Sequence, residues 1–152
     1  MTRRLVTVDA LRRAILVILV IVLVGTEIEL FLLKHTEDYW QLVPIVLIPL
    51  TLVILTWHGV TKGRAALRTL QGVMLLCVIS GGIGVIQHYR ANLIDAAESD
   101  PSLSGRGLYI GALQGAIPAL AAGTMVQIGL LGLAFAFRHP RLRPRTDGPA
   151  SD

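Results

Sequence analysis

Two carboxylates, Glu27 and Glu29, lie within a run of apolar residues that extends from Ala14 to Leu33. A carboxylate in the centre of a bilayer costs about 2.5–3.5 kcal/mol or more, so such a residue faces protein, water, a cation or a proton rather than acyl chains. Each residue of a helix turns by about 100°, which places these two carboxylates about 160° apart. The sequence therefore predicts a functional site in which at most one of the two acids lies beside the polar residues of other helices.

Histidines and further carboxylates near the same membrane surface provide the ligand types of a divalent metal. Imidazole and carboxylate groups bind Zn, Fe or Mn without a thiolate. The candidate ligands are Glu27, His35, Glu37, His88 and Asn92. No Glu-x-x-His pair and no His-Glu-x-x-His motif accompanies them, so the competing interpretation treats His35 and His88 as interfacial residues. Haem b held between these two histidines is a further alternative.

More polar side chains are expected on the same, outer side of the membrane. They are Glu29, Asp38, Gln41, Gln87, Tyr89 and Gln114. Because they come from different apolar runs, they can converge on one polar, acidic pocket or docking surface. The serines have no base at a recognisable spacing, so no catalytic residue is predicted and an enzymatic role is not favoured.

Membrane-crossing helices must position these residues. Of the 152 residues, 53% are hydrophobic and only 16% are charged. A helix needs about 20 apolar residues to cross the hydrocarbon core. Four apolar runs are close to this length, at residues 14–33, 42–58, 69–88 and 118–137. The composition predicts an all-α, polytopic membrane protein with four transmembrane helices in an antiparallel bundle.

Proline and charge set the expected boundaries. A single transmembrane domain is expected at residues 1–138, followed by a basic, disordered cytoplasmic tail at residues 139–152. The third helix should continue past His88 and end where Asp100 and Pro101 interrupt the helical pattern.

The last apolar stretch, Leu108 to Phe137, is too long for one ordinary crossing, and Pro118 divides it. This pattern predicts an outer interfacial segment at residues 100–117 before the fourth span. A single long, kinked helix is the competing interpretation. In the third run, Ser80 and Gly84 have the small-xxx-small spacing that permits close packing of helices.

Basic residues set the orientation. Only three of the fourteen lysines and arginines, namely Lys34, Arg90 and Arg106, fall on the outer side of the four predicted spans. Positive residues concentrate on the cytoplasmic side of membrane proteins, so both termini are expected in the cytoplasm. The basic balance therefore reflects topology, and no nucleic-acid partner is expected. The outer loops are acidic and favour cations over anions.

The remaining titratable groups suggest little chemistry. His58 and His139 are expected at the cytoplasmic face, with His139 solvated in the basic tail. The single cysteine, Cys77, has no partner for an intrachain disulfide. It is interpreted as a small buried packing residue.

Three segments carry a family resemblance: Glu29 to Pro44 (ELFLLKHTEDYWQLVP), Gln87 to Asn92 (QHYRAN) and Gly115 to Gly132 (GAIPALAAGTMVQIGLLG). Together they resemble a group of small, uncharacterised bacterial inner-membrane proteins with four helices. The resemblance implies a multi-pass protein of the bacterial inner membrane, in which the polar residues of these segments belong together. It brings no reaction with it.

Three classes of function follow. The first is a non-enzymatic accessory or interaction subunit, which sits in the lipid bilayer and docks onto a second copy or another membrane protein. The second is a membrane protein that binds a divalent metal or, as a lesser alternative, haem b through the outer histidines and carboxylates. The third is a membrane enzyme or redox protein. The ample packing surface and the scarcity of assembled chemistry favour the first class.

Overall fold

The structure, a computed structural model, is helical and confirms the predicted all-α class. It describes residues 2–34, 36, 39–115, 117 and 121–142. Helix α1 comprises Thr2–Leu32, α2 Tyr39–Thr61, α3 Arg64–Ser99, α4 Gly105–Leu113 and α5 Gly123–Ala136, and a short 3-10 helix, η1, follows at Pro140–Leu142. Several residues singled out in the sequence lie outside the described residues, namely His35, Glu37, Asp38 and Pro118.

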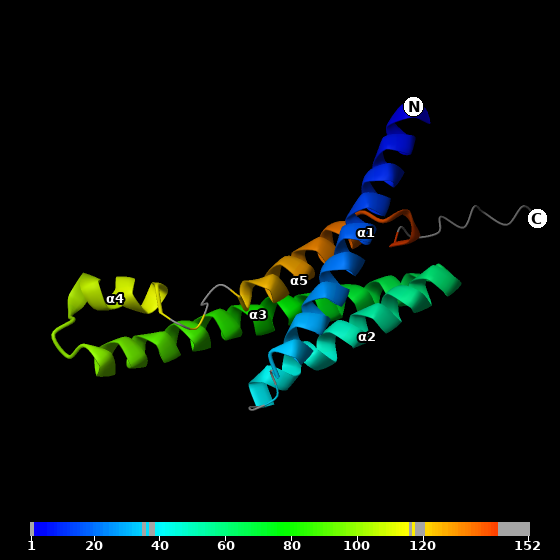
Figure 1. Cartoon of the computed structure of the whole chain (residues 1–152). Helices are drawn as coiled ribbons and strands as arrows, with labels where there is room; N and C mark the ends of the chain where they lie inside the picture. Colours follow the sequence, from blue (N-terminus) through cyan, green and yellow to red (C-terminus); the bar gives the residue numbers. More distant parts are fainter. Residues whose placement is uncertain (1, 35, 37–38, 116, 118–120, 143–152) are drawn as a thin grey trace, which may run out of the picture.

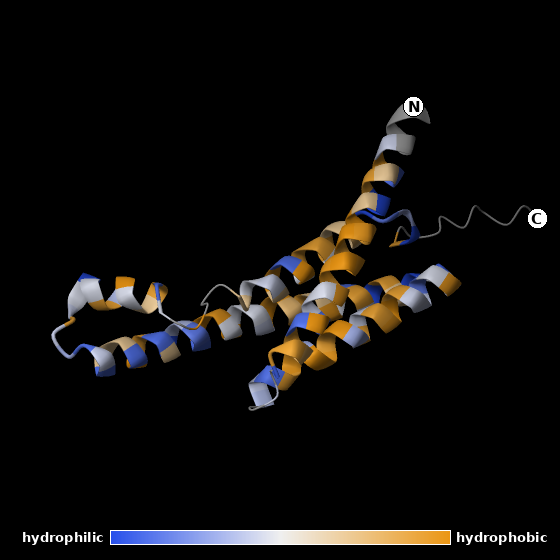
Figure 2. Cartoon of the chain, viewed as in Figure 1, coloured by the Kyte–Doolittle hydropathy of each residue, from blue (hydrophilic) through white to orange (hydrophobic). Residues whose placement is uncertain are grey.

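Three helices are long and apolar enough to cross a membrane: α1 from Thr7 to Leu32, α2 and α3. Figure 2 shows apolar residues along these helices on outward as well as inward faces. Ile21 of α1 and Val53 of α2 are each 65% exposed. Soluble monomers rarely expose contiguous apolar surface on this scale, whereas a bilayer solvates it. The helices are those of a small membrane protein.

The fourth predicted span is not confirmed. The apolar run predicted a helix at residues 118–137, but α5 begins at Gly123 and comprises 14 residues. A helix of this length measures about 21 Å, less than the hydrocarbon core of about 30 Å. The N–H groups of Thr124 and Met125 donate to the carbonyls of Ala121 and Ala122 at 3.1 and 3.2 Å, so a tight turn precedes α5.

Helices α4 and α5 are separate, and the interpretation of one long kinked helix is therefore wrong. The backbone N–H of Gln114 donates to the carbonyls of Ile110 and Gly111, both at 3.1 Å, and α4 ends there. Helix α4 folds back along the C-terminal part of α3, away from α1 and α2 (Figure 1).

Helix α3 is the central element of the fold. It packs against α2, α4 and α5, while α1 crosses α2 and α5 obliquely (Figure 1). Apolar residues from four helices form one core, including Leu19 and Leu23 of α1, Ile48 of α2, Met74 of α3 and Ile128 of α5. The packed helices have two ends. The connection from α1 to α2 lies at one end, and the connection from α2 to α3 lies at the other.

Glycines allow α3 and α5 to approach closely. A Cβ added to Gly84 of α3 would lie 2.8 Å from the Cβ of Ala122, and one added to Gly129 of α5 would lie 2.6 Å from the carbonyl oxygen of Met74. Real Cβ atoms do not come so close to other atoms, so both positions require glycine. The expected packing role of the Ser80 and Gly84 spacing is confirmed at Gly84.

The predicted end of α3 is also confirmed. The helix runs to Ser99 and is capped by Asp100, directly before Pro101. The hydroxyl and the backbone N–H of Ser102 donate to Oδ1 of Asp100 at 2.6 and 3.0 Å. These hydrogen bonds stabilise the carboxylate and lower the pKa of Asp100. The Asp100 side chain thus stabilises a turn of the backbone that leads from α3 into α4.

Candidate functional site

A pocket of about 700 Å³ lies where α1, α2, α3 and the start of α5 meet. We call it the polar pocket. Polar side chains from all four helices line it, namely Thr26, Glu29, Gln41, Ser80, Gln87, His88 and Thr124. Its volume is within the range of about 300–1,000 Å³ typical of small-molecule sites.

Four of the residues selected from the sequence meet in the polar pocket: Glu29, Gln41, Gln87 and His88. Gln87 and His88 are neighbours on α3, whereas Glu29 and Gln41 lie on opposite sides of the turn between α1 and α2. Sequence reasoning missed Thr26 and Thr124. Helical spacing could have identified Thr26 as a pocket residue, because it precedes Glu29 by three residues and shares the same face of α1.

Glu27 and Glu29 take different positions, as their helical spacing predicted. Glu29 lines the polar pocket, whereas Glu27 does not. The Oε2 atom of Glu27 is buried and has no hydrogen-bond partner among the described residues. Glu27 lies one turn beyond the buried Leu23, on the face of α1 that packs against the other helices. Of the two acids, Glu29 is therefore the one available to a molecule in the pocket.

The polar pocket is partly open, and its described walls are largely apolar. Leu33 and Trp40 line it and are 67% and 54% exposed. Leu30 and Val43 continue the wall from α1 and α2, and Met125 completes it from α5. Apolar walls with a few converging polar groups are characteristic of pockets that bind organic molecules.

Asn92 makes structural contacts. Its side chain is 1% exposed, and its Nδ2 donates to the carbonyl oxygen of Ile117 at 2.6 Å. The N–H of Ile117 donates back to Oδ1 of Asn92 at 3.1 Å. The amide therefore fixes the connection between α4 and α5 to α3. Tyr89 and Gln114, which were also selected from the sequence, do not line the polar pocket.

The predicted metal ligands do not assemble among the described residues. In that part of the chain, no three side chains of His, Cys, Asp and Glu lie close enough together to hold a metal ion. Two of the five predicted ligands, His35 and Glu37, lie outside it. The metal set and the haem alternative therefore remain predictions from the sequence.

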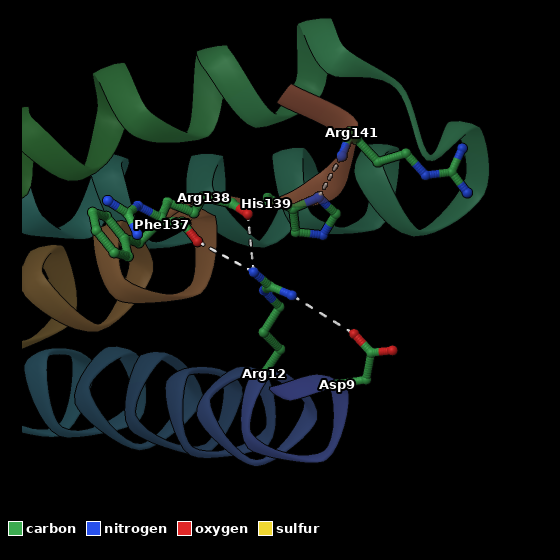
Figure 3. A network of polar contacts seen from close by, with 6 residues as sticks. All are labelled: Asp9, Arg12, Phe137, Arg138, His139 and Arg141. Atoms are coloured by element: carbon green, nitrogen blue, oxygen red, sulfur yellow. Dashed lines mark hydrogen bonds and ion pairs between the residues drawn. The ribbon is translucent and has the colours of Figure 1, made fainter. Parts of the chain in front are cut away.

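A second polar cluster lies at the opposite end of the molecule, where the C-terminus of α5 meets α1 (Figure 3). Nη2 of Arg12 donates to the carbonyl oxygens of Phe137 and Arg138 at 3.4 and 3.0 Å. Its Nη1 lies 3.6 Å from the Asp9 carboxylate. The carbonyls at the end of a helix lack partners within the helix and carry partial negative charge, so the Arg12 guanidinium caps α5.

Three rings pack together beside this cap. The centroid of His139 lies 5.4 Å from that of His58 and 5.8 Å from that of Phe135. The N–H of Arg141 donates to Nδ1 of His139 at 3.3 Å. Burial, followed by the proximity of His58, Arg12 and Arg141, lowers the pKa of His139.

This packing differs from the expectation that His139 is solvated. Ring contacts with α2 and α5 hold the histidine partly buried, and η1 follows it directly. The sequence around His139 contains arginines and prolines and gives no sign of these distant ring partners.

Comparisons with known proteins supply no family assignment. No family model, no curated protein and no solved structure matches the chain.

Proposed function

We propose that this chain is a non-enzymatic accessory protein of the bacterial inner membrane that acts by binding, and that the polar pocket is its binding site. The observation that carries the proposal is the convergence of Glu29, Gln41, Gln87 and His88 on one partly open, largely apolar pocket. Such a pocket can hold and orient a molecule or a group of a membrane partner.

The proposed topology has four crossings and both termini in the cytoplasm. Its support is the distribution of charge between the two ends of the molecule. Lys62, Arg64 and Arg138 lie at the end opposite to the polar pocket, as does the Arg12 cap. Clustered positive charge is typical of the cytoplasmic side. The polar pocket then faces the outer side.

Helix α5 supports the fourth crossing despite its length. Thr124 and Met125, at its start, line the polar pocket, and the carbonyls of Phe137 and Arg138, just after its end, contact Arg12 at the other end of the molecule. The chain therefore passes from one end to the other through α5. The turn before α5 extends the length of chain available to cross the membrane beyond that of the helix itself.

A substitution that fills the pocket tests the proposal. The protein is purified in mild detergent, and the lipids, small molecules and proteins that accompany it are identified by native and proteomic mass spectrometry. A phenylalanine at Thr26 occupies the pocket, whereas one at Ile28, which is exposed and does not line it, leaves the pocket free. We expect a specific companion with the wild type and with Ile28→Phe, and its loss with Thr26→Phe. Retention of the same companion by Thr26→Phe would refute the proposal.

A further inference from the structure

The charge of the polar pocket restricts what it binds. Glu29 is the one acidic side chain among its described lining residues, where His88 is the one basic side chain and no lysine or arginine occurs. No described cation forms an ion pair with the Glu29 carboxylate. The Glu29 carboxylate is exposed beside apolar residues such as Leu30 and Leu33, so it is accessible to a positively charged group of a bound molecule.

Neutral groups around Glu29 suit a donor-rich cation. An ammonium group has three N–H donors and no acceptor. The side-chain oxygens of Thr26, Ser80 and Gln87 are acceptors on two helices around the same space. Trp40, which also lines the pocket, adds an aromatic ring of the kind that attracts a cation. One carboxylate and several neutral acceptors therefore match one primary ammonium group.

The size and walls of the pocket determine the rest of the molecule. A helix about 10–12 Å across would fill 700 Å³ with fewer than two of its turns, so a transmembrane helix of a partner protein is too large. The apolar residues Val43, Ile83 and Met125 instead offer a surface along which one flexible chain can lie. Leu33 and Trp40 both line the pocket and are exposed, so a molecule can reach the pocket beside them.

We propose that the polar pocket binds a single-chain amphiphile with a primary ammonium head, which contacts Glu29 while the chain lies against the apolar walls. This inference depends on the proposed function, because it names the class of molecule that the binding site accepts. A peptide segment of a partner protein is the alternative occupant, and the experiments below distinguish it.

Tryptophan fluorescence provides a local test. The chain has two tryptophans, of which Trp40 lines the pocket and Trp57 does not. The full-length Trp57→Phe protein reports on the pocket through Trp40, and the Trp40→Phe protein reports on general partition into the detergent through Trp57. The quenchers are dodecylammonium, dodecanol and dodecanoate, each brominated in mid-chain.

We expect the ammonium probe, corrected for partition with Trp57, to quench Trp40 at about tenfold lower concentration than the alcohol. Glu29→Gln should abolish this preference. Glu98→Gln should retain it, because Glu98 is an exposed acid outside the pocket.

Other outcomes separate the two proposals. Equal quenching by all three probes, or a preference that survives Glu29→Gln, overturns the ammonium inference and leaves a binding pocket. If no probe reaches Trp40 and a protein companion is lost in Thr26→Phe, the occupant is a peptide and the ammonium inference is wrong. If no probe reaches Trp40 and no companion depends on Thr26, the proposed function fails as well.

Discussion

The side-chain amide of Asn92 and the backbone of Ile117 form a reciprocal pair of hydrogen bonds, at 2.6 and 3.1 Å, between residues 25 positions apart. The Asn92 amide donates to and accepts from the backbone of Ile117, as a residue of a neighbouring β-strand would. Gly115 makes room for it, because a Cβ at that position would lie 2.5 Å from Cγ of Asn92. These hydrogen bonds attach the connection between α4 and α5 to α3.

Replacing Asn92 by leucine should release this connection. Leucine fills a similar volume but leaves both backbone groups of Ile117 without their partner, so we expect a loss of about 1–2 kcal/mol in the free energy of unfolding. Hydrogen exchange provides the local measurement, since the Ile117 amide should lose its protection. Gln127→Leu is the control, because Gln127 is exposed on α5. An Ile117 amide that stays protected in Asn92→Leu would contradict the assignment.

The Arg12 cap predicts unequal effects of two neighbouring arginines. Arg12→Met retains an apolar stem but removes the donors to Phe137 and Arg138, and should cost about 1 kcal/mol of stability, a value reduced by partial exposure. Arg13→Met should cost much less, because Arg13 is exposed and forms no such contact. Thermal unfolding in detergent measures both. Equal losses of stability in Arg12→Met and Arg13→Met would show that Arg12 contributes through its charge alone and not through the cap.

The lowered pKa of His139 predicts sensitivity to acid. Because the folded state disfavours the imidazolium, the unfolded chain binds more protons between the folded pKa and the ordinary value of about 6.5. Stability should therefore fall as the pH falls from about 6.5 through this window. His139→Phe keeps a ring against His58 and Phe135, and it should reduce the slope of stability against pH. An unchanged slope in a pH series of unfolding curves would exclude His139 as its origin.

The glycine contact between α3 and α5 predicts a contrast between two alanine substitutions. A Cβ at Gly129 would meet the Met74 carbonyl at 2.6 Å, whereas one at Gly72 meets nothing within 4 Å. Gly129→Ala should force the helices apart and lower the midpoint of thermal unfolding, at a cost of about 1–3 kcal/mol. Gly72→Ala should be neutral or slightly stabilising, since alanine favours the helix. A tolerated alanine at Gly129 would mean that the helices pack less closely.

The proposed topology is tested with single cysteines in a Cys77→Ala background. Ser102 lies in the turn between α3 and α4, and Lys62 lies in the turn between α2 and α3. Both are exposed. A membrane-impermeant maleimide applied to intact spheroplasts should label Ser102→Cys and should label Lys62→Cys only after the membrane is opened. The reverse pattern would invert the orientation.

Features that depend on local pattern could be predicted from the sequence. Apolar run length indicated the helices, and the change of composition at Asp100 and Pro101 indicated the end of α3. The sequence grouped Glu29, Gln41 and His88 among the polar residues expected on one side of the membrane, and the three side chains line one pocket.

Features that depend on a distant partner could not be predicted. Nothing near Asn92 indicates a bond to Ile117, and nothing near Arg12 indicates the carbonyls of Phe137 and Arg138. The start of α5 at Gly123 was also missed. Hydropathy marks residues 118–137 as one apolar run and does not indicate where the helix begins. The turn before α5 depends on backbone geometry instead.

The contribution of α5 to the polar pocket has a consequence for synthesis. When the ribosome has completed α4 at Leu113, three of the four helices around the pocket exist, but the wall at Thr124 and Met125 does not. Arg12, made among the first residues, meets its carbonyl partners only after Arg138 has emerged. A nascent chain that stalls before α5 therefore lacks one wall of the polar pocket and the cap that Arg12 provides.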